Sequence, residues 1–409
     1  MKLFEVDTLE EARAKLCAAA GPSFVTTETV PVPRALGRVL AEELRSGIDV
    51  PGFLRSTVDG YAVVARDTQG AGESIPVFLK TVGEVAMGRP ATVTVESGTC
   101  AYVPTGGMLP PGADAMVMVE YCEPFGDDGV AVYSAVGTGR STVARGEDIR
   151  EGTVFLKKGT VIRPQEIGAM ASAGVRQATV YRPLTVTILS TGDELADPAE
   201  TLTPGKIYDI NTYALEALAA RRGFVVNGRQ VVRDDAAALE DAMRQGMARS
   251  DIVVISGGSS QGKKDMTADI IDRLADCGVL THGLAVKPGK PTILGYDKAS
   301  RTMLAGLPGH PVAAMMVFEL IVCRAVRELT GQAPAIGVYA AMETNVGCDA
   351  GKSNCILIEL LDGPDGYIAR PIYGKSGLIT TLSRAHGYTV TDRNKEGVRG
   401  GETVFVNLL

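Results

Sequence analysis

The stretch DIVVISGGSSQGKKD, residues 251–265, decides the fold. Its apolar run, Ile252 to Ile255, ends in a loop rich in glycine and serine, and apolar residues 270, 271 and 274 follow at helical spacing. This order predicts a strand, a loop and a helix. Ligands of open α/β sheets collect at the carboxyl ends of strands, where free N–H groups and the helix dipole favour an anion. We therefore interpret the loop as a cradle for a phosphate or an oxyanion.

Two familiar nucleotide-binding motifs are disfavoured at this loop. Gly257, Gly262 and Lys263 fit the Walker A opening G-x-x-x-x-G-K, but Lys264 stands where that motif needs Ser or Thr to hold Mg²⁺. The loop also lacks the G-x-G-x-x-G pattern of a dinucleotide site. A tight turn without any ligand therefore remains the alternative to an anion cradle.

Composition predicts a soluble, cytoplasmic protein with several domains. The chain has 409 residues, and domains usually hold roughly 100 to 200 residues. A net charge of −7 argues against nucleic acid as a partner. No apolar stretch reaches the roughly 18 residues of a membrane helix, so we expect no membrane partner. The seven cysteines form no C-x-x-C pair, which is typical of reduced thiols in the cytosol.

The first 182 residues mix helices with a β-rich insertion. Residues 8–11, TLEE, form a capping box before a predicted helix, and residues 35–44 have the spacing of a second helix. Pro164 begins a further predicted helix. Short β-like runs fill the region between. The expected division is an N-terminal domain of residues 1–46 and 147–182, interrupted by an inserted β-rich domain of residues 47–146.

The second half of the chain has a different pattern. Between residues 183 and 331, apolar strands alternate with helices, which predicts βαβ units and a mostly parallel sheet covered on both faces. Residues 332–409 hold β-like runs between turns and predict a C-terminal β domain. The predicted fold class is multidomain α/β, with one three-layer α/β domain and several β-rich domains.

Three loops follow apolar strands of the α/β domain: residues 190–194, 256–265 and 306–311. Because parallel strands end at one edge of a sheet, we expect these loops to form one composite pocket. Two loops bring carboxylates that need a hard cation such as Mg²⁺ beside an anion. The turn KPGKP, residues 287–291, adds two lysines. Helix caps and solvated charges remain the alternative interpretation of these residues.

Several motifs resemble those of the molybdopterin molybdenumtransferase family, which comprises MoeA and the E-domain of gephyrin. They follow the family's order over nearly the whole chain: STVDGYAV (56–63), PTGGMLPPGADA (104–115), GEDI (146–149), STGDEL (190–195), GKIYDIN (205–211), SGGSSQGKKD (256–265), KPGKP (287–291) and GLPGHPV (306–312). The resemblance implies elongated four-domain protomers with a molybdopterin-binding α/β domain. It also implies a homodimer that uses residues 1–46 and 147–182 as its linker and dimerisation domain.

The resemblance further implies a reaction and its partners. Molybdate would be inserted into adenylylated molybdopterin, with Mg²⁺ as the cofactor and AMP as a product. The pocket would lie next to the β-rich domain of the partner subunit. A molybdopterin adenylyltransferase would act upstream, and molybdoenzymes would receive the cofactor downstream.

Individual site residues follow from the same resemblance. The expected catalytic residues are Asp59, Thr105, Asp148, Glu194, Asp234 and Asp265. Glu194 and Asp265 would hold the metal beside the adenylate, and the first three would surround molybdate from the β-rich side. The expected substrate-binding residues are Ser190, Thr191, Gly192, Asp193, Ser256, Gly257, Gly258, Ser259, Lys287, Pro288, Gly289, Lys290, Pro308, Gly309, His310, Pro311, Lys352 and Ser376.

The chain departs from the family pattern at positions that bear on anion binding. His310 stands where Asn is usual, Ala313 where Ser is usual, and Val143 and Gly283 where Arg and Lys are usual. Lys352 replaces an Arg and keeps the charge without the bidentate fork. Two alternatives to a molybdenum insertase therefore stay open: a pterin carrier or scaffold without turnover, and an insertase that prefers tungstate.

Overall fold

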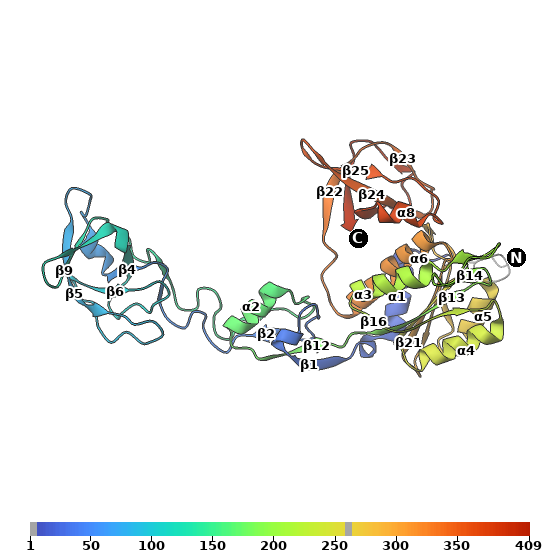
Figure 1. The fold of residues 1–409 in the computed structure, drawn as a ribbon, viewed down its shortest axis with the longest axis horizontal. Coiled ribbons are helices and arrows are strands. Elements are labelled where there is room, and N and C mark those ends of the chain that lie inside the picture. Colours follow the sequence, from blue (N-terminus) through green and yellow to red (C-terminus); the bar gives the residue numbers. More distant parts are fainter. Residues whose placement is uncertain (1–5, 258–263) are drawn as a thin grey trace.

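The computed structural model describes residues 6–257 and 264–409, with all of their side chains except those of Lys264 and Asp265. The chain is elongated (Figure 1). A β-rich unit occupies one end, and a small linker unit with α2 (Pro164–Ser172) lies in the middle. The α/β unit lies at the other end beside a C-terminal β unit. The expected multidomain α/β class with β-rich units is confirmed.

A six-stranded sheet forms the centre of the α/β unit. Its strand order is β16 (Val225–Val232), β13 (Thr185–Thr191), β17 (Ile252–Gly257), β21 (Thr302–Leu307), β20 (Ile293–Asp297) and β18 (Val279–His282). The first four strands are parallel, and the last two are each antiparallel to their neighbour. The mostly parallel sheet that the alternating pattern predicted is therefore present.

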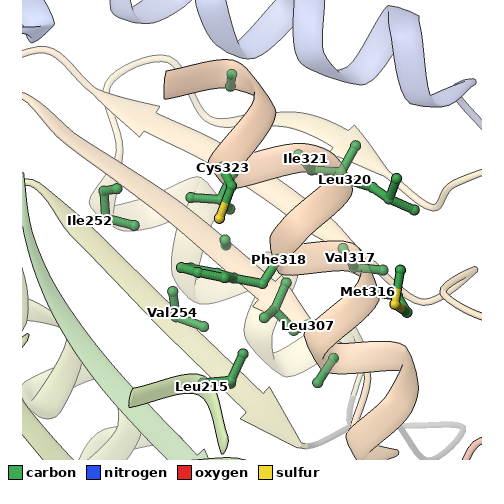
Figure 2. Packing of buried hydrophobic residues seen from close by; sticks show 14 of the residues in the cluster. Leu215, Ile252, Val254, Leu307, Met316, Val317, Phe318, Leu320, Ile321 and Cys323 are labelled. Carbon is green, nitrogen blue, oxygen red and sulfur yellow. The ribbon is translucent and has the colours of Figure 1, made fainter. Parts of the chain in front are cut away.

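Helices cover both faces of this sheet because successive strand residues point to opposite sides. Ile252 and Val254 pack with Phe318 in one core, as Figure 2 shows, whereas Val253 and Ile255 belong to the core on the other face. The helices of the first core are α3 (Asn211–Arg221), α6 (Pro311–Val317), the π-helical η5 (Phe318–Cys323) and α7 (Arg324–Leu329). Those of the second core are α4 (Ala236–Met247) and α5 (Lys264–Leu274).

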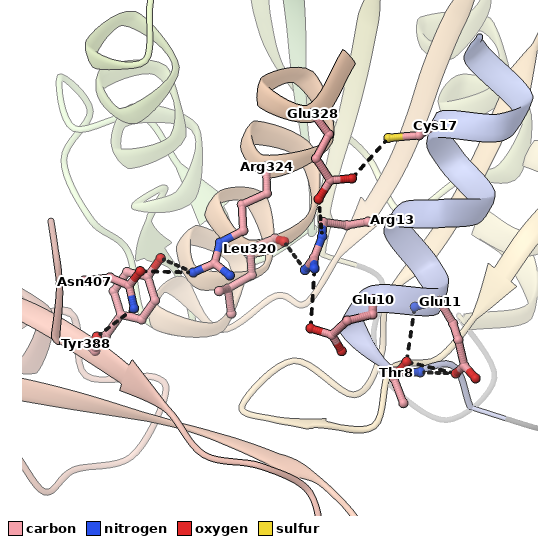
Figure 3. A network of polar contacts seen from close by, with 10 residues as sticks. All are labelled: Thr8, Glu10, Glu11, Arg13, Cys17, Leu320, Arg324, Glu328, Tyr388 and Asn407. Carbon is pink, nitrogen blue, oxygen red and sulfur yellow. Dashed lines mark hydrogen bonds and ion pairs between the residues drawn. The ribbon is translucent and has the colours of Figure 1, made fainter. Parts of the chain in front are cut away.

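Helix α1 (Leu9–Ala20) packs on the α/β unit. The predicted capping box is present, because the Glu11 backbone N–H donates to Thr8 Oγ1 at 3.1 Å. Arg13 Nε donates to a Glu328 carboxylate oxygen at 3.0 Å and ties α1 to α7 (Figure 3). The grouping of residues 1–46 with 147–182 as one domain stays a prediction, although its first helix lies against the α/β core.

The linker unit shows that the helix expected over residues 35–44 was wrong. Gly37 has a φ of +76°, and its N–H donates to the carbonyl of Ile162 at 2.8 Å. The N–H of Leu40 likewise donates to the carbonyl of Thr160 at 2.9 Å. These bonds to a distant segment replace the local bonds that a helix requires. The strands of this unit are β1 (Thr27–Pro31) with β12 (Gln177–Tyr181), and β2 (Leu44–Arg45) with β11 (Val154–Leu156).

The β-rich unit is built on a second six-stranded sheet. Its order is β7 (Ala115–Met118), β4 (Gly60–Val63), β6 (Thr99–Val103), β5 (Val77–Glu84), β9 (Gly129–Val132) and β8 (Cys122–Phe125). A separate pair joins β3 (Arg55–Ser56) to β10 (Thr142–Val143). The short 3-10 helices η3 (Ala65–Thr68) and η4 (Val119–Tyr121) also belong to this unit. Two more 3-10 helices, η1 (Pro22–Phe24) and η2 (Val32–Arg34), lie closer to the N-terminus.

The C-terminal unit is a third sheet that also takes a strand from the α/β unit. Its order is β19 (Val286–Lys287), β24 (Ser353–Gly363), β25 (Gly366–Pro371), β22 (Gly337–Met342), β28 (Thr403–Leu408) and β26 (Gly387–Val390). Three short elements complete it: β23 (Val346–Gly347), β27 (Gly397–Val398) and α8 (Ile379–Ser383).

A polar contact also holds the C-terminal unit against α7. Arg324 Nη2 donates to the hydroxyl of Tyr388 at 3.2 Å and to Asn407 Oδ1 at 3.3 Å (Figure 3). Together with the pairing of β19 and β24, this contact places the C-terminal unit beside the α/β unit. Within residues 6–257 and 264–409, no helix has the length and apolar character needed to cross a membrane.

Candidate active site

The carboxyl ends of β13, β17 and β21 lie side by side. Thr191 pairs in register with Gly257, and Ser256 pairs with Leu307. The loops that follow these strands therefore leave the sheet at one edge, as the parallel order predicted. Gly258 and Ser259, which were expected to bind substrate, lie outside the described residues.

A first cavity of about 380 Å³ opens at this edge, and we call it the acidic cavity. Its lining residues, among those that the structure describes, include the carboxylates of Glu194, Asp209 and Asp234 and contain no Lys or Arg. Further lining residues from the expected set are Thr191, Ser256, Gly257, Gly309, His310 and Pro311. The cavity therefore presents oxygen atoms to a ligand and suits cations and N–H donors.

A tight turn places Glu194 at the acidic cavity. The N–H of Leu195 donates to the carbonyl of Gly192 at 3.2 Å, and β14 (Leu195–Ala196) then pairs with β15 (Ile207–Tyr208). A Cβ on Gly192 would lie 2.8 Å from both carboxylate oxygens of Glu194. Only glycine leaves room for the carboxylate in this position, which explains the small residue in the loop.

Three expected binding residues, Ser190, Gly192 and Asp193, have internal roles in the loops. Ser190 is 1% exposed and shares a hydrogen bond of 2.7 Å with Thr212 Oγ1. Asp193 Oδ1 accepts from the N–H of Asp234 at 3.3 Å, and its carbonyl accepts from the Lys206 side chain. Ser190, Gly192 and Asp193 line neither this cavity nor the one described next. They hold the shape of the loop.

Asn211, at the start of α3, is a site residue that the candidate set missed. Its Nδ2 donates to Ser256 Oγ at 2.7 Å and to the carbonyl of Gly309 at 2.7 Å. The side chain thus joins the ends of β17 and β21, and it also lines the acidic cavity. Asn211 is the last residue of the motif GKIYDIN. The motif alone does not indicate what the side chain contacts.

A second cavity of about 860 Å³ lies between the α/β unit and the C-terminal unit, and we call it the basic cavity. Four lysines and one aspartate, Asp349, provide its charge: Lys287, Lys290, Lys352 and Lys375. Lys287 Nζ lies 3.0 Å from Asp349 Oδ1, and Lys352 Nζ lies 3.7 Å from Oδ2. The hydrogen bond from Lys287 lowers the pKa of the Asp349 carboxyl. An excess of positive charge remains for an anion.

Glycine and proline shape the turn that carries two of these lysines. Gly289 has a φ of +129°, and a Cβ there would lie 2.6 Å from Val317 Cγ2. The turn therefore packs directly on helix α6, and Pro288, Gly289, Pro308 and Ser376 line the basic cavity with the lysines. The expected residues of this group are thus brought together, with Lys352 among them.

Gly309 and His310 line both cavities. His310 Nδ1 lies 2.8 Å from Ser376 Oγ, and the N–H of Val312 donates to the carbonyl of Ser376 at 3.2 Å. Residues of all three strand-end loops line the acidic cavity, as the composite pocket predicted. The turn with Lys287 and Lys290 instead lines the basic cavity, so the expected single site is corrected to two cavities that meet at Gly309 and His310. The lysines fall in the second cavity because β19 pairs with β24, a long-range contact that strand order alone does not reveal.

Three expected catalytic residues are distant from this site within one chain. Asp59 Oδ1 accepts from the backbone N–H of Thr105 at 2.7 Å, and the N–H of Asp148 donates to the carbonyl of Val50 at 3.1 Å. All three are exposed. Asp59 precedes β4 and Thr105 follows β6, two strands of the β-rich unit at the far end of the molecule (Figure 1). Asp148 lies between β10 and β11, where the chain passes from the β-rich unit to the linker unit. The structure brings Asp59 and Thr105 together but leaves them apart from the two cavities.

A magnesium ion fits the donor chemistry of the acidic cavity. Mg²⁺ prefers oxygen ligands and binds through one or two carboxylates while it keeps several waters and substrate phosphates. The cradle that glycine leaves beside the Glu194 carboxylate supplies such a ligand. The side chain of Asp265 lies outside the described residues, and the rest contain no group of three or more His, Cys, Asp or Glu placed for a metal.

These features define a multidomain α/β protein whose ligand pocket lies at strand ends and is shared with a C-terminal β unit. Residues 7–174 match the family model for the MoeA N-terminal region (domain I and II), and residues 355–409 match that for the MoeA C-terminal region (domain IV). Residues 187–328 match the model described as "Probable molybdopterin binding domain".

Individual proteins agree with these matches. The chain is 30% identical to a molybdopterin molybdenumtransferase of Haemophilus influenzae, over 98% of both chains. A crystal structure of a molybdopterin biosynthesis MoeA protein from Pyrococcus horikoshii OT3 is 30% identical, with a TM-score of 0.82 over 99% of this chain and 100% of that one. A second Pyrococcus MoeA structure is 34% identical, with a TM-score of 0.77 over 99% of both chains. The chain belongs to the MoeA family.

Proposed function

We propose that the protein is a molybdopterin molybdenumtransferase, an enzyme that inserts molybdate into adenylylated molybdopterin and releases AMP with the help of Mg²⁺. The observation that carries this proposal is the contact between an acidic and a basic cavity at Gly309 and His310. A ligand with a cation-bridged phosphate and a separate oxyanion needs both kinds of surface. A simple nucleotide or oxyanion carrier needs only one.

The acidic cavity is assigned to the adenylylated end of the substrate. Glu194 and Asp265 would hold Mg²⁺, which neutralises phosphate charge and polarises the phosphoric anhydride when bound. Glu194 is set at the cavity by the turn at Gly192. Asp234 adds a further carboxylate to the same cavity. Water adds to the anhydride phosphorus as the bond to AMP breaks.

The basic cavity is assigned to the oxyanion. Lys287, Lys290 and Lys352 supply positive charge that offsets the desolvation of molybdate, and Ser376 adds a hydroxyl group. Two Mo–S bonds form with the dithiolene while Mo–O bonds break and oxygen leaves as water. Holding the oxyanion next to the sulfurs replaces a bimolecular encounter with a positioned one.

A homodimer would complete the site. Asp59 and Thr105 adjoin β4 and β6 of the β-rich unit, and Asp148 follows β10, so we infer that they serve this pocket from a second copy. The elongated shape allows two antiparallel copies to place each β-rich unit beside the other copy's α/β unit. We also propose a cytoplasmic location, an upstream adenylyltransferase and downstream molybdoenzymes as partners.

A pterin carrier or scaffold without turnover is the second candidate, and one contact favours it. Asp349 pairs with both Lys287 and Lys352, so part of the positive charge of the basic cavity is already compensated. Weaker oxyanion binding would allow pterin to bind without insertion. A preference for tungstate is a variant of the first candidate, since both oxyanions carry the same charge.

The test is to incubate the full-length protein with adenylylated molybdopterin, molybdate and Mg²⁺. We expect AMP to be released together with an equal amount of molybdenum cofactor, and omission of Mg²⁺ to slow both. Pterin binding without AMP release would contradict the enzyme and support the carrier. Replacing molybdate by tungstate in the same assay measures the oxyanion preference.

A further inference from the structure

Two oxygen atoms of the acidic cavity are buried, and within the described residues they have no hydrogen-bond partner: Thr191 Oγ1 and Asn211 Oδ1. Both residues line the cavity, and Thr191 is 4% exposed. Buried polar atoms normally have a partner, because an unmet hydrogen bond costs free energy. The two oxygens therefore point to a ligand that satisfies them.

The orientation of the Asn211 amide is fixed by its neighbours. Gly309 contributes a carbonyl, which can only accept, so the atom 2.7 Å from it must be Nδ2. Ser256 Oγ donates to the carbonyl of Pro308 at 3.3 Å, which leaves it free to accept from the same Nδ2. Oδ1 is thereby turned away from both partners, and it can only accept a hydrogen bond.

The second oxygen lies at the end of β13. A Cβ on Gly257, the residue paired with Thr191, would lie 2.7 Å from Thr191 Oγ1. Glycine at this position therefore keeps the space beside the hydroxyl open. A hydroxyl can donate or accept, so it adapts to a ligand atom of either kind.

A magnesium ion does not account for these two atoms. Mg²⁺ binds through one or two carboxylates and keeps several waters, and Glu194 already offers a carboxylate in the same cavity. Neutral amide and hydroxyl oxygens in an apolar surround are the groups that recognise N–H donors of a heteroaromatic ring. Leu195, Ile207 and Ile210 supply apolar lining beside the carboxylates of this cavity.

We propose that Asn211 Oδ1 and Thr191 Oγ1 recognise the N–H edge of a heteroaromatic ring of the substrate, with Asn211 as the obligatory acceptor. This inference rests on the proposed function, since it concerns the ligand of the same site. An adenylylated pterin has two such edges: the 6-amino group of adenine, and the amino and ring N–H groups of the pterin. Both present the same donor chemistry.

The test measures the affinity of the full-length protein for three probes by titration calorimetry. The probes are AMP, the purine riboside 5′-monophosphate that lacks the 6-amino group, and molybdopterin. Thr191→Val removes the hydroxyl and keeps the branched shape. Asn211→Ala removes the acceptor, and Asn227→Ala is its matched control because Asn227 Nδ2 donates to the carbonyl of Arg249, away from both cavities.

Two results support the inference and identify the ring. If adenine is recognised, the wild type binds AMP roughly tenfold more tightly than the purine analogue, the scale of one hydrogen bond to a buried group. Thr191→Val and Asn211→Ala then reduce this ratio towards one. If the pterin is recognised, the same two variants lose roughly tenfold in molybdopterin affinity, and the AMP ratio stays near one throughout.

Wild-type affinity for all three probes in Thr191→Val and Asn211→Ala would overturn the inference. Circular dichroism spectra of the variants show whether they are folded, so that a loss of affinity is not mistaken for unfolding. Thr191→Val is the milder change, because it leaves the contacts of Asn211 in place. The insertion assay tests the proposed function separately. AMP release by the wild type, together with unchanged affinities in the variants, would contradict this inference and leave the proposed function standing. A wild type that binds none of the probes and releases no AMP would overturn both.

Discussion

His310 Nδ1 lies 2.8 Å from Ser376 Oγ, and this contact joins the N-cap residue of α6 to the C-terminal unit. The same histidine lines both cavities. The contact sets the position of the wall between the acidic and basic cavities.

Ser376→Ala should weaken this wall. We expect a loss of roughly 0.5–1.5 kcal/mol in the free energy of unfolding, as for one hydrogen bond. We also expect a higher KM for adenylylated molybdopterin with a smaller change in kcat, because the ring is no longer held. Denaturant unfolding and steady-state AMP release measure the two effects. Ser383→Ala is the control, since Ser383 Oγ donates only to the carbonyl of Thr380 in α8. An unchanged KM in Ser376→Ala would contradict the assignment.

Gly192→Ala should displace the Glu194 carboxylate without unfolding the protein. The added Cβ would lie 2.8 Å from that carboxylate, which is the mobile end of a flexible side chain. We expect the apparent Mg²⁺ affinity in the AMP-release assay to fall by roughly 10–100-fold, with little change in thermal stability. Gly168→Ala is the control, because a Cβ there would meet nothing within 4 Å. Normal Mg²⁺ dependence in Gly192→Ala would argue against Glu194 as a metal ligand.

Asp349 and Lys287 should affect oxyanion binding in opposite directions. Asp349→Asn removes the carboxylate that compensates Lys287 and Lys352, so molybdate should bind more tightly. Lys287→Ala should weaken binding. Each change is expected to be roughly two- to fivefold, the range of an exposed ion pair, and to shrink at high salt. Molybdate titration at two ionic strengths measures both, with Lys158→Ala on the distant linker unit as a control. Changes of the same sign would contradict the assignment of the basic cavity.

Asp251 should make stability depend on pH. Burial raises the pKa of its carboxyl, but hydrogen bonds from Arg182 and Thr185 outweigh burial and hold the pKa below the ordinary value of 3.8. A lowered pKa in the folded state stabilises the fold at pH values above the ordinary pKa. That contribution is lost as the pH falls through the folded-state pKa.

Asp251→Asn should therefore destabilise the protein near pH 7. We expect a loss of roughly 1.5–3 kcal/mol, since the carboxylate is 19% exposed and its hydrogen bonds are charge-assisted. The difference from wild type should persist down to about pH 5 and shrink below the ordinary pKa of 3.8. Urea unfolding between pH 2 and 7 tests this, with the exposed Asp241→Asn as the control. A constant difference across that range would show that the charge of Asp251 does not stabilise the fold.

The strand ends of the α/β unit were predictable because the rule for parallel strands needs only local information. Apolar runs before Ser190, Ser256 and Gly306 indicated the strands, and their common direction placed the loops at one edge. The same local reasoning failed over residues 35–44, where apolar spacing suggested a helix. There the backbone of Gly37 and Leu40 bonds to residues 162 and 160, a long-range pairing that no local pattern shows.

The division of the site into two cavities was not predictable for a similar reason. It depends on the pairing of β19 with β24 and on Asp349, which lies in the C-terminal unit and contacts two lysines. Asn211 was overlooked because its role depends on how its side-chain amide is oriented, with Nδ2 donating to Gly309 and Oδ1 left as an acceptor. That orientation follows from the carbonyl of Gly309, which is 98 residues away in the sequence.

We propose that one active site is built from the α/β unit of one chain and the β-rich unit of another. The direct test mixes two inactive variants, Asp59→Asn and Glu194→Gln, and measures AMP release. Random association makes about half of the dimers mixed, and each mixed dimer holds one intact shared site, so roughly a quarter of wild-type activity should return. No recovery of AMP release in verified mixed dimers would contradict the shared site. If each site lay within a single chain, every site in a mixed dimer would carry one of the two mutations and stay inactive.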